Sequence, residues 1–220
     1  MPETTVLPGK LLRSAAAGAV YRQRFLHFEV GLQFLDCGEH HLPPGSATQS
    51  VALPDRETLL FQWQGSATAE LPDSRRELEH YDVLYVPRGC AFRLDNPASA
   101  PACVIQVTAP AENFHAVFHA RFREVSERED RIRRLKGKDV YLMFDVGEPA
   151  DKLVAGCTFF RPYQRSWPPH NHTDQEEVYF FLKGCGSMEV YESPETLSFV
   201  HHVEAGDLVA IPMLNFHPVF

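Results

Sequence analysis

The sequence predicts an all-β protein built from two similar units in tandem. Of its 220 residues, 44% are hydrophobic and 23% are charged, a composition that supports a packed core and excludes disordered and fibrous classes. Its 17 prolines and 13 glycines are spread along the chain, as in proteins made of many short strands. The length alone admits one large or two small domains, and an internal repeat favours two.

The repeat emerges when the chain is aligned with itself. Segment 57–71 matches 176–190 at an offset of 119 residues, and 81–92 matches 206–217 at an offset of 125. The first match sets Glu57 on Glu176, Phe61 on Phe180 and Gly65 on Gly184; the second sets Asp82 on Asp207, Pro87 on Pro212 and Phe92 on His217. Each unit therefore reads as a hairpin, a loop and an apolar strand ended by a proline.

The repeat also indicates where the units begin and end. We expect an N-terminal unit over residues 1–110, a linker over 111–137 and a C-terminal unit over 138–220. The linker is rich in charge, and its stretch 119–125 fits either a short helix or an alternating strand.

The second unit is short compared with the first. After Phe92 the first unit continues into an apolar strand at 102–107, whereas three residues follow His217. We therefore expect the second unit to lack its closing strand, with residues 207–217 left at an edge. Because an exposed apolar edge invites aggregation, we expect a missing part of the chain or a neighbouring subunit to cover it.

Charge and cysteine usage narrow the possible partners. The formal net charge is −8, which disfavours nucleic acid and anionic membranes, since both are bound by positive surfaces. No run of residues is long and apolar enough for a membrane span. The five cysteines are odd in number and include no CxxC pair: Cys37, Cys90, Cys103, Cys157 and Cys185. We expect reduced core thiols in a cytoplasmic protein.

One polar cluster stands out in the second unit. Residues i and i+2 of a strand share a face, so His170 and His172 can present two imidazoles side by side. Such a pair alone is more often an ordinary strand or surface feature, but a glutamate follows at Glu177 or, as the competing carboxylate, Glu176. A further histidine, His217, ends a distant apolar strand. Three imidazoles and one carboxylate suit one divalent metal ion, zinc first, with manganese, iron, cobalt or nickel as alternatives.

The first unit carries no equivalent cluster. The repeat sets the two histidines of the pair on Val51 and Leu53, or on Gly45 and Ala47 if the preceding proline pairs are aligned, and it sets His217 on Phe92. The pair His40-His41 is interpreted as solvated or capping. We expect a first unit without metal ligands, retained for structure.

The spacing of the cluster resembles the two motifs of the cupin family. Four residues separate His172 from Glu177 and six separate Glu177 from Gly184, a spacing that favours Glu177 over Glu176 as the ligand. Gly206, Pro212 and His217 match the second motif, although Asn215 precedes the histidine instead of following it. The resemblance implies two tandem jelly-roll β-barrels, with metal ligands His170, His172, Glu177 and His217.

Three phrases narrow the resemblance further. SWPPHNHTD, EEVYFF and IPMLNFHPV are similar to segments of two isomerases of the cupin type, 5-deoxy-glucuronate isomerase and 5-keto-4-deoxyuronate isomerase. The similarity is clear from Tyr141 onward and architectural before it. The first enzyme has a longer insert between the histidine pair and the glutamate, whereas four residues separate His172 from Glu177 here. The second enzyme has the short spacing but lacks the PPH phrase. The exact substrate therefore stays open. The resemblance implies aldose–ketose interconversion of a small sugar acid, with the metal as Lewis acid.

Such a reaction needs a proton-transfer group and a partner for the substrate carboxylate. Tyr179, Glu189 and metal-bound water are the candidate bases. Arg161, Arg165 and Lys183 are candidate cations for the carboxylate, although each is individually more often a solvated surface charge.

Two other functions use the same ligands. A metal-dependent dioxygenase of the cupin type would consume oxygen, and a non-catalytic sugar-acid-binding cupin would bind without turnover. In each case we expect a small-molecule ligand and a homo-oligomer.

Overall fold

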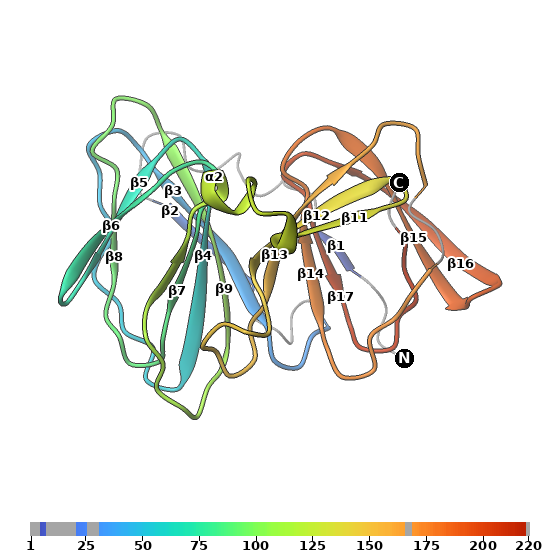
Figure 1. Cartoon of the computed structure of the whole chain (residues 1–220), viewed down its shortest axis with the longest axis horizontal. Coiled ribbons are helices and arrows are strands. Elements are labelled where there is room, and N and C mark those ends of the chain that lie inside the picture. The colour runs from blue at the N-terminus through green and yellow to red at the C-terminus, as the bar shows by residue number, and fades with distance from the viewer. Residues whose placement is uncertain (1–4, 8–20, 26–30, 166–168, 219–220) are drawn as a thin grey trace.

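The computed structural model describes residues 5–7, 21–25, 31–165 and 169–218, and nearly all of its regular structure is strand. Figure 1 shows two β-units side by side, joined by a short connection that contains the helix α2 (Phe122–Val125). The all-β fold is confirmed. None of the helices in the described ranges is long and apolar enough to cross a membrane.

The first unit is a sandwich of two antiparallel sheets. Its strands are β2 (Tyr21–Phe25), β3 (Asp36–Leu42), β4 (Arg56–Gln64), β5 (Ala67–Leu71), β6 (Ser74–Leu78), β7 (Val83–Val86), β8 (Arg93–Asp95), β9 (Ala102–Pro110) and β10 (Phe118–Ala120). One sheet has the order β10-β7-β4-β9-β3-β2 and the other β6-β5-β8. Between them lies an apolar core that includes Leu42, Leu60, Leu78, Phe92 and Val104.

The second unit is assembled from three smaller sheets. Its strands are β1 (Thr5–Leu7), β11 (Ile132–Leu135), β12 (Lys138–Phe144), β13 (Ala155–Phe160), β14 (Glu177–Phe180), β15 (Cys185–Ser193), β16 (Thr196–Glu204) and β17 (Leu208–Ile211). The sheet orders are β11-β12-β13, β1-β17-β14 and β15-β16. Met188, Val203, Val209 and Ile211 form its buried core, against which Phe160, Tyr179 and Phe181 pack.

The hydrogen bonds of the two units reproduce the repeat seen in the sequence. The amide of Gln62 donates to the carbonyl of Asp82, and the amide of Phe181 donates to the carbonyl of Asp207, each at 2.9 Å. The backbone bridge between Val51 and Phe92 likewise has its counterpart between His170 and His217. Because these pairs are related by the same offsets of 119 and 125 residues, the two segments of the repeat adopt the same local structure.

The connection between the units is shorter than the sequence indicates. β10 pairs with β7 and therefore extends the first unit to Ala120, while β11 pairs with β12 and starts the second unit at Ile132. Between them lie α2 and one 3-10 turn, η2 (Glu129–Arg131). The ambiguous stretch 119–125 contains both structures, since its first residues finish β10 and its last form α2.

The N-terminal strand corrects two expectations: that residues 1–110 all belong to the first unit, and that the edge beside residues 207–217 is bare. β1 pairs antiparallel with β17, with Thr5 opposite Ala210 and Leu7 opposite Leu208, so residues 5–7 belong to the sheet of the second unit (Figure 1). β17 therefore has a strand on both sides, and the expected bare edge beside residues 207–217 is wrong. Within the described ranges this sheet ends at β1 on one side and at β14 on the other, whereas β4, which corresponds to β14, pairs with β9 in the first unit.

Two repeat-related glutamates join the units reciprocally. Glu57 of the first unit is fully buried and accepts hydrogen bonds from the amides of Asp151 (2.8 Å), Lys152 (2.7 Å) and Leu153 (2.9 Å), and from the Tyr85 hydroxyl (2.9 Å). Glu176 of the second unit accepts from the amides of Gln33, Phe34 (2.9 Å) and Leu35 (3.1 Å). Each carboxylate thus satisfies three successive amides in the other unit.

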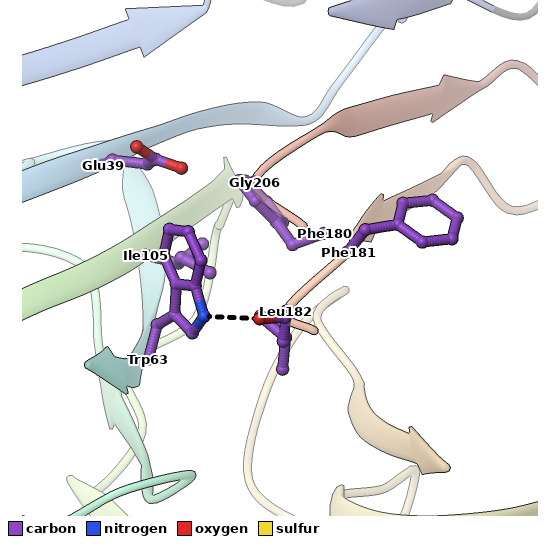
Figure 2. Close-up of a pocket in the computed structure, with 7 residues that line it drawn as sticks. All are labelled: Glu39, Trp63, Ile105, Phe180, Phe181, Leu182 and Gly206. Carbon is purple, nitrogen blue, oxygen red and sulfur yellow. Dashed lines mark hydrogen bonds between the residues drawn. The ribbon is translucent and has the colours of Figure 1, made fainter. Parts of the chain in front are cut away.

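Apolar packing completes the junction. Trp63 and Ile105 from the first unit line a pocket with Phe180 and Leu182 from the second, and the Trp63 indole donates to the Leu182 carbonyl at 3.2 Å (Figure 2). Glu39 lies at the rim of the same pocket. The outer face of the six-stranded sheet is therefore covered by the second unit.

None of the five cysteines forms a disulfide, and Cys37, Cys103 and Cys157 are buried. Burial raises the pKa of Cys37 and of Cys157 to about 12. Cys185 is exposed, which corrects the expectation of five core thiols. It begins β15 directly after the turn at Gly184, where the chain leaves the core.

Candidate metal centre

The four predicted metal ligands converge in the second unit. The nitrogen and oxygen ligand atoms of His170, His172, Glu177 and His217 all lie within 4.8 Å of one another. Glu177 is the first residue of β14, and His170 forms an antiparallel bridge with His217. Backbone pairing thus brings together residues that are 47 positions apart in the sequence.

Hydrogen bonds orient the imidazoles around the carboxylate. Nε2 of His217 lies 3.0 Å and Nε2 of His172 lies 3.4 Å from Oε2 of Glu177. Nδ1 of His217 is 2.9 Å from the backbone carbonyl of Asn215. Since a carbonyl only accepts, Nδ1 donates to it, and Nε2 is the nitrogen that faces Glu177 and that would bind a metal in place of its proton.

The pKa values of His170, His172 and Glu177 are shifted by their neighbours in the cluster. Partial loss of water around the His170 ring, together with the neighbouring His217, lowers the pKa of His170 to about 4. The hydrogen bond to Glu177 raises the pKa of His172. Burial raises the pKa of Glu177, but the hydrogen bonds from His172 and His217 outweigh it and hold that pKa below its usual range.

The donor set fits a divalent ion. Three imidazole nitrogens and one carboxylate oxygen match the ligand preferences of zinc and of the later first-row metals. His217 is fully buried, whereas the His170 side chain is exposed. A bound ion would therefore be anchored on the core side and reachable from the solvent side.

The structure separates the two competing glutamates. Glu177 faces the histidines, while Glu176 faces the first unit and caps its amides, as strand alternation requires. Tyr179 lies on the same strand face as Glu177, and its ring is 6.2 Å from the His217 ring, measured between centroids. Burial, followed by the charge of Glu177, raises the pKa of Tyr179 well above its usual value. Tyr179 is therefore a protonated phenol on the Glu177 face of β14.

Glu189 is turned away from the ligands. Its neighbour Met188 packs in the same core as Tyr179, so alternation directs Glu189 to the opposite face of β15. There the Glu189 carboxylate accepts from the Tyr191 hydroxyl at 2.7 Å and from Nε of Arg165 at 3.1 Å. The structure thus places both Glu189, a candidate base, and Arg165, a candidate substrate cation, in an ion pair outside the ligand cluster.

The other two candidate cations also lie elsewhere. Arg161 is exposed and its guanidinium is 3.8 Å from the carboxylate of Asp139. Lys183 is exposed in the turn between β14 and β15. Residues 166–168, which precede the histidine pair, lie outside the described residues.

The sequence reasoning missed a cation on the inner side of the second unit. Lys138, the first residue of β12, lies against Phe160, which packs on the same core as Tyr179. Burial lowers the pKa of Lys138, and the negative charge of Glu177 opposes this shift. The sequence does contain a pattern that marks Lys138, because strand alternation sets it on the same face as Val140 and Leu142. A lysine on an otherwise apolar strand face is unusual enough to mark a site.

The first unit has apolar residues at the two bridged positions. Val51 and Phe92 form the bridge that corresponds to His170 and His217, and Phe92 is buried in the core. His40 is buried and hydrogen-bonds to Gln106 at 2.6 Å, which corrects the interpretation of His40 as solvated or capping, since β3 is covered on both faces.

A second ligand-like group lies on the outer face of the first-unit sheet. Glu39, His41 and Cys103 have ligand atoms within 4.8 Å of one another. His41 Nε2 lies 2.8 Å from the Glu39 carboxylate, an ion-pair geometry at the junction of the two units.

Comparisons with known proteins agree with the fold of two tandem β-units. A model of the KduI/IolB family matches residues 12–220. An IolB-like protein from Salmonella typhimurium LT2 superposes with a TM-score of 0.80 at 19% identity, covering 97% of this chain and 86% of the other. No curated protein sequence matches the chain.

Two further solved structures share the fold. A deletion mutant of Bacillus subtilis oxalate decarboxylase OxdC gives a TM-score of 0.76 at 14% identity, covering 98% of this chain and 72% of the other. Protein Ylba from E. coli gives 0.69 at 13% identity, covering 100% and 86%. These likenesses confirm the bicupin fold expected from the motifs. Because the family model spans nearly the whole sequence, the chain belongs to the KduI/IolB family, a family of isomerases that includes 5-keto-4-deoxyuronate isomerase.

Proposed function

We propose that this chain is a metal-dependent aldose–ketose isomerase that acts on a small sugar acid, a uronate or a deoxy-uronate. The observation that carries the proposal is the convergence of His170, His172, Glu177 and His217 in a chain of the KduI/IolB family. One divalent ion, zinc first, is the proposed cofactor. A bound ion would supply a Lewis acid for the sugar carbonyl.

The chain's own residues prepare this chemistry. The Asn215 carbonyl orients the His217 ring by accepting a hydrogen bond from Nδ1, and the Tyr179 phenol lies beside that ring on the Glu177 face of β14. Because Tyr179 stays protonated, we assign it the role of a hydrogen-bond donor and acid in place of a base. The exposed His170 marks the side from which the sugar acid enters.

The proposal is tested by incubating the metal-loaded protein with a panel of uronates and deoxy-uronates. We expect NMR to show loss of the aldehyde signal and growth of a ketose product from at least one compound, at the same rate with and without oxygen. Oxygen consumption coupled to product formation would instead assign a dioxygenase. Ligand-induced thermal stabilisation without product would assign a sugar-acid-binding cupin.

A further inference from the structure

Lys138 is a partly buried cation on the inner side of the second unit. It pairs across from Phe160 of β13, and its ammonium nitrogen lies 5.6 Å from the centroid of the Phe160 ring. Phe160 packs against the same core as Tyr179. The Tyr179 ring in turn lies 6.2 Å from the ring of His217, measured between centroids. Lys138 thus lies over the core that also holds Tyr179, whose ring is next to the ligand His217.

The next residue of β12 confirms the direction of Lys138. Asp139 points to the opposite side of the strand, where its carboxylate meets Arg134 at 3.5 Å and Arg161 at 3.8 Å. Those two arginines are exposed. Because neighbouring strand residues alternate in direction, Lys138 faces inward while the arginines beside it face the solvent.

The charges around Lys138 call for an anionic ligand. In the described residues Lys138 interacts with the negative charge of Glu177. An ion held by three neutral imidazoles and one carboxylate keeps a net positive charge, and Glu177 then no longer offsets the ammonium. Two cationic groups in one partly buried site repel each other, and a negatively charged group between them removes that cost.

We propose that Lys138 binds the carboxylate of a sugar acid whose carbonyl end lies at the metal centre. This inference rests on the function proposed above and assigns the group that selects acids over neutral sugars. A single ammonium carries one positive charge, which matches the one negative charge of a carboxylate, whereas a phosphate group carries more negative charge than one lysine neutralises.

The test compares three probes on metal-loaded protein by isothermal titration calorimetry: D-glucuronate, D-glucose and D-glucose 6-phosphate. In Lys138→Met we expect the dissociation constant for glucuronate to rise at least about tenfold, with glucose binding and metal content unchanged. Lys138→Arg should recover part of the loss, since the charge is kept. Lys183→Met removes an exposed lysine of the same unit and should behave as the unchanged protein.

Other outcomes overturn the assignment. Equal weakening for glucose and glucuronate would show a structural role, and unchanged glucuronate binding, or none in the unchanged protein, would show that Lys138 does not recognise it. Binding of only glucose 6-phosphate in a Lys138-dependent manner would assign a phosphate. Lys138-dependent glucuronate binding without a ketose product would support this inference and contradict the isomerase function. Product formation with an unchanged KM in Lys138→Met would support the isomerase function and contradict this inference.

Discussion

A chain carrying both His170→Ala and His172→Ala is expected to lose its metal, with the content falling from about one ion per chain to below about 0.1. The two changes remove half of the ligand atoms that lie within 4.8 Å of one another. Glu177 and His217 remain hydrogen-bonded to each other, but two ligands do not complete a four-coordinate site. The measurement is metal analysis by mass spectrometry after dialysis.

The matched control is His201→Ala with His202→Ala, which removes two imidazoles from β16 of the same unit outside the ligand cluster. We expect this variant to keep its full metal content. The unchanged protein should also gain thermal stability from added zinc, by about 2.7 kcal/mol at a hundredfold excess over the dissociation constant, and the ligand variant should gain none. A full metal content in the variant that lacks both His170 and His172 would refute the proposed metal site.

Replacing Glu57 by alanine is expected to destabilise the protein by at least about 3 kcal/mol. The Glu57 carboxylate is fully buried and satisfies three backbone amides and the Tyr85 hydroxyl. Alanine would leave all four donors without an acceptor in the junction of the two units. Urea denaturation followed by circular dichroism measures the loss.

The repeat supplies the control for this prediction. Glu176→Ala removes the corresponding carboxylate, but Gln33 and Phe34, whose amides it binds, are exposed. Water can replace the carboxylate there, so we expect a loss of about 1 kcal/mol. Equal losses in the two variants would show that burial of the donors does not decide the cost.

The repeat and the convergence of the four candidate ligands were predictable from the sequence because both depend on local spacing. Strand alternation fixes which of two neighbouring residues faces inward, and this separated Glu177 from Glu176 correctly. The offset of 125 residues likewise set His217 on Phe92, and both lie at the same place in their units.

The surroundings of the site were not predictable in the same way. Lys138 lies far from the ligands in sequence, and only the pairing of β12 with β13 places it beside Phe160 on the core of the second unit. Arg165 precedes the histidine pair but is held by Glu189 on the other face of β15. The pairing of β1 with β17 joins the two ends of the described chain, a contact that no local pattern encodes.

The central claim is that the ligand cluster of the second unit makes this chain a metal-dependent isomerase. It is tested most directly by stripping the protein with a chelator and titrating zinc back while following D-glucuronate and the active compounds of the panel by NMR under nitrogen. We predict no conversion in the stripped protein and a rate that rises linearly until about one ion per chain is bound. Full conversion in the stripped protein, or none at any metal loading, would contradict the account.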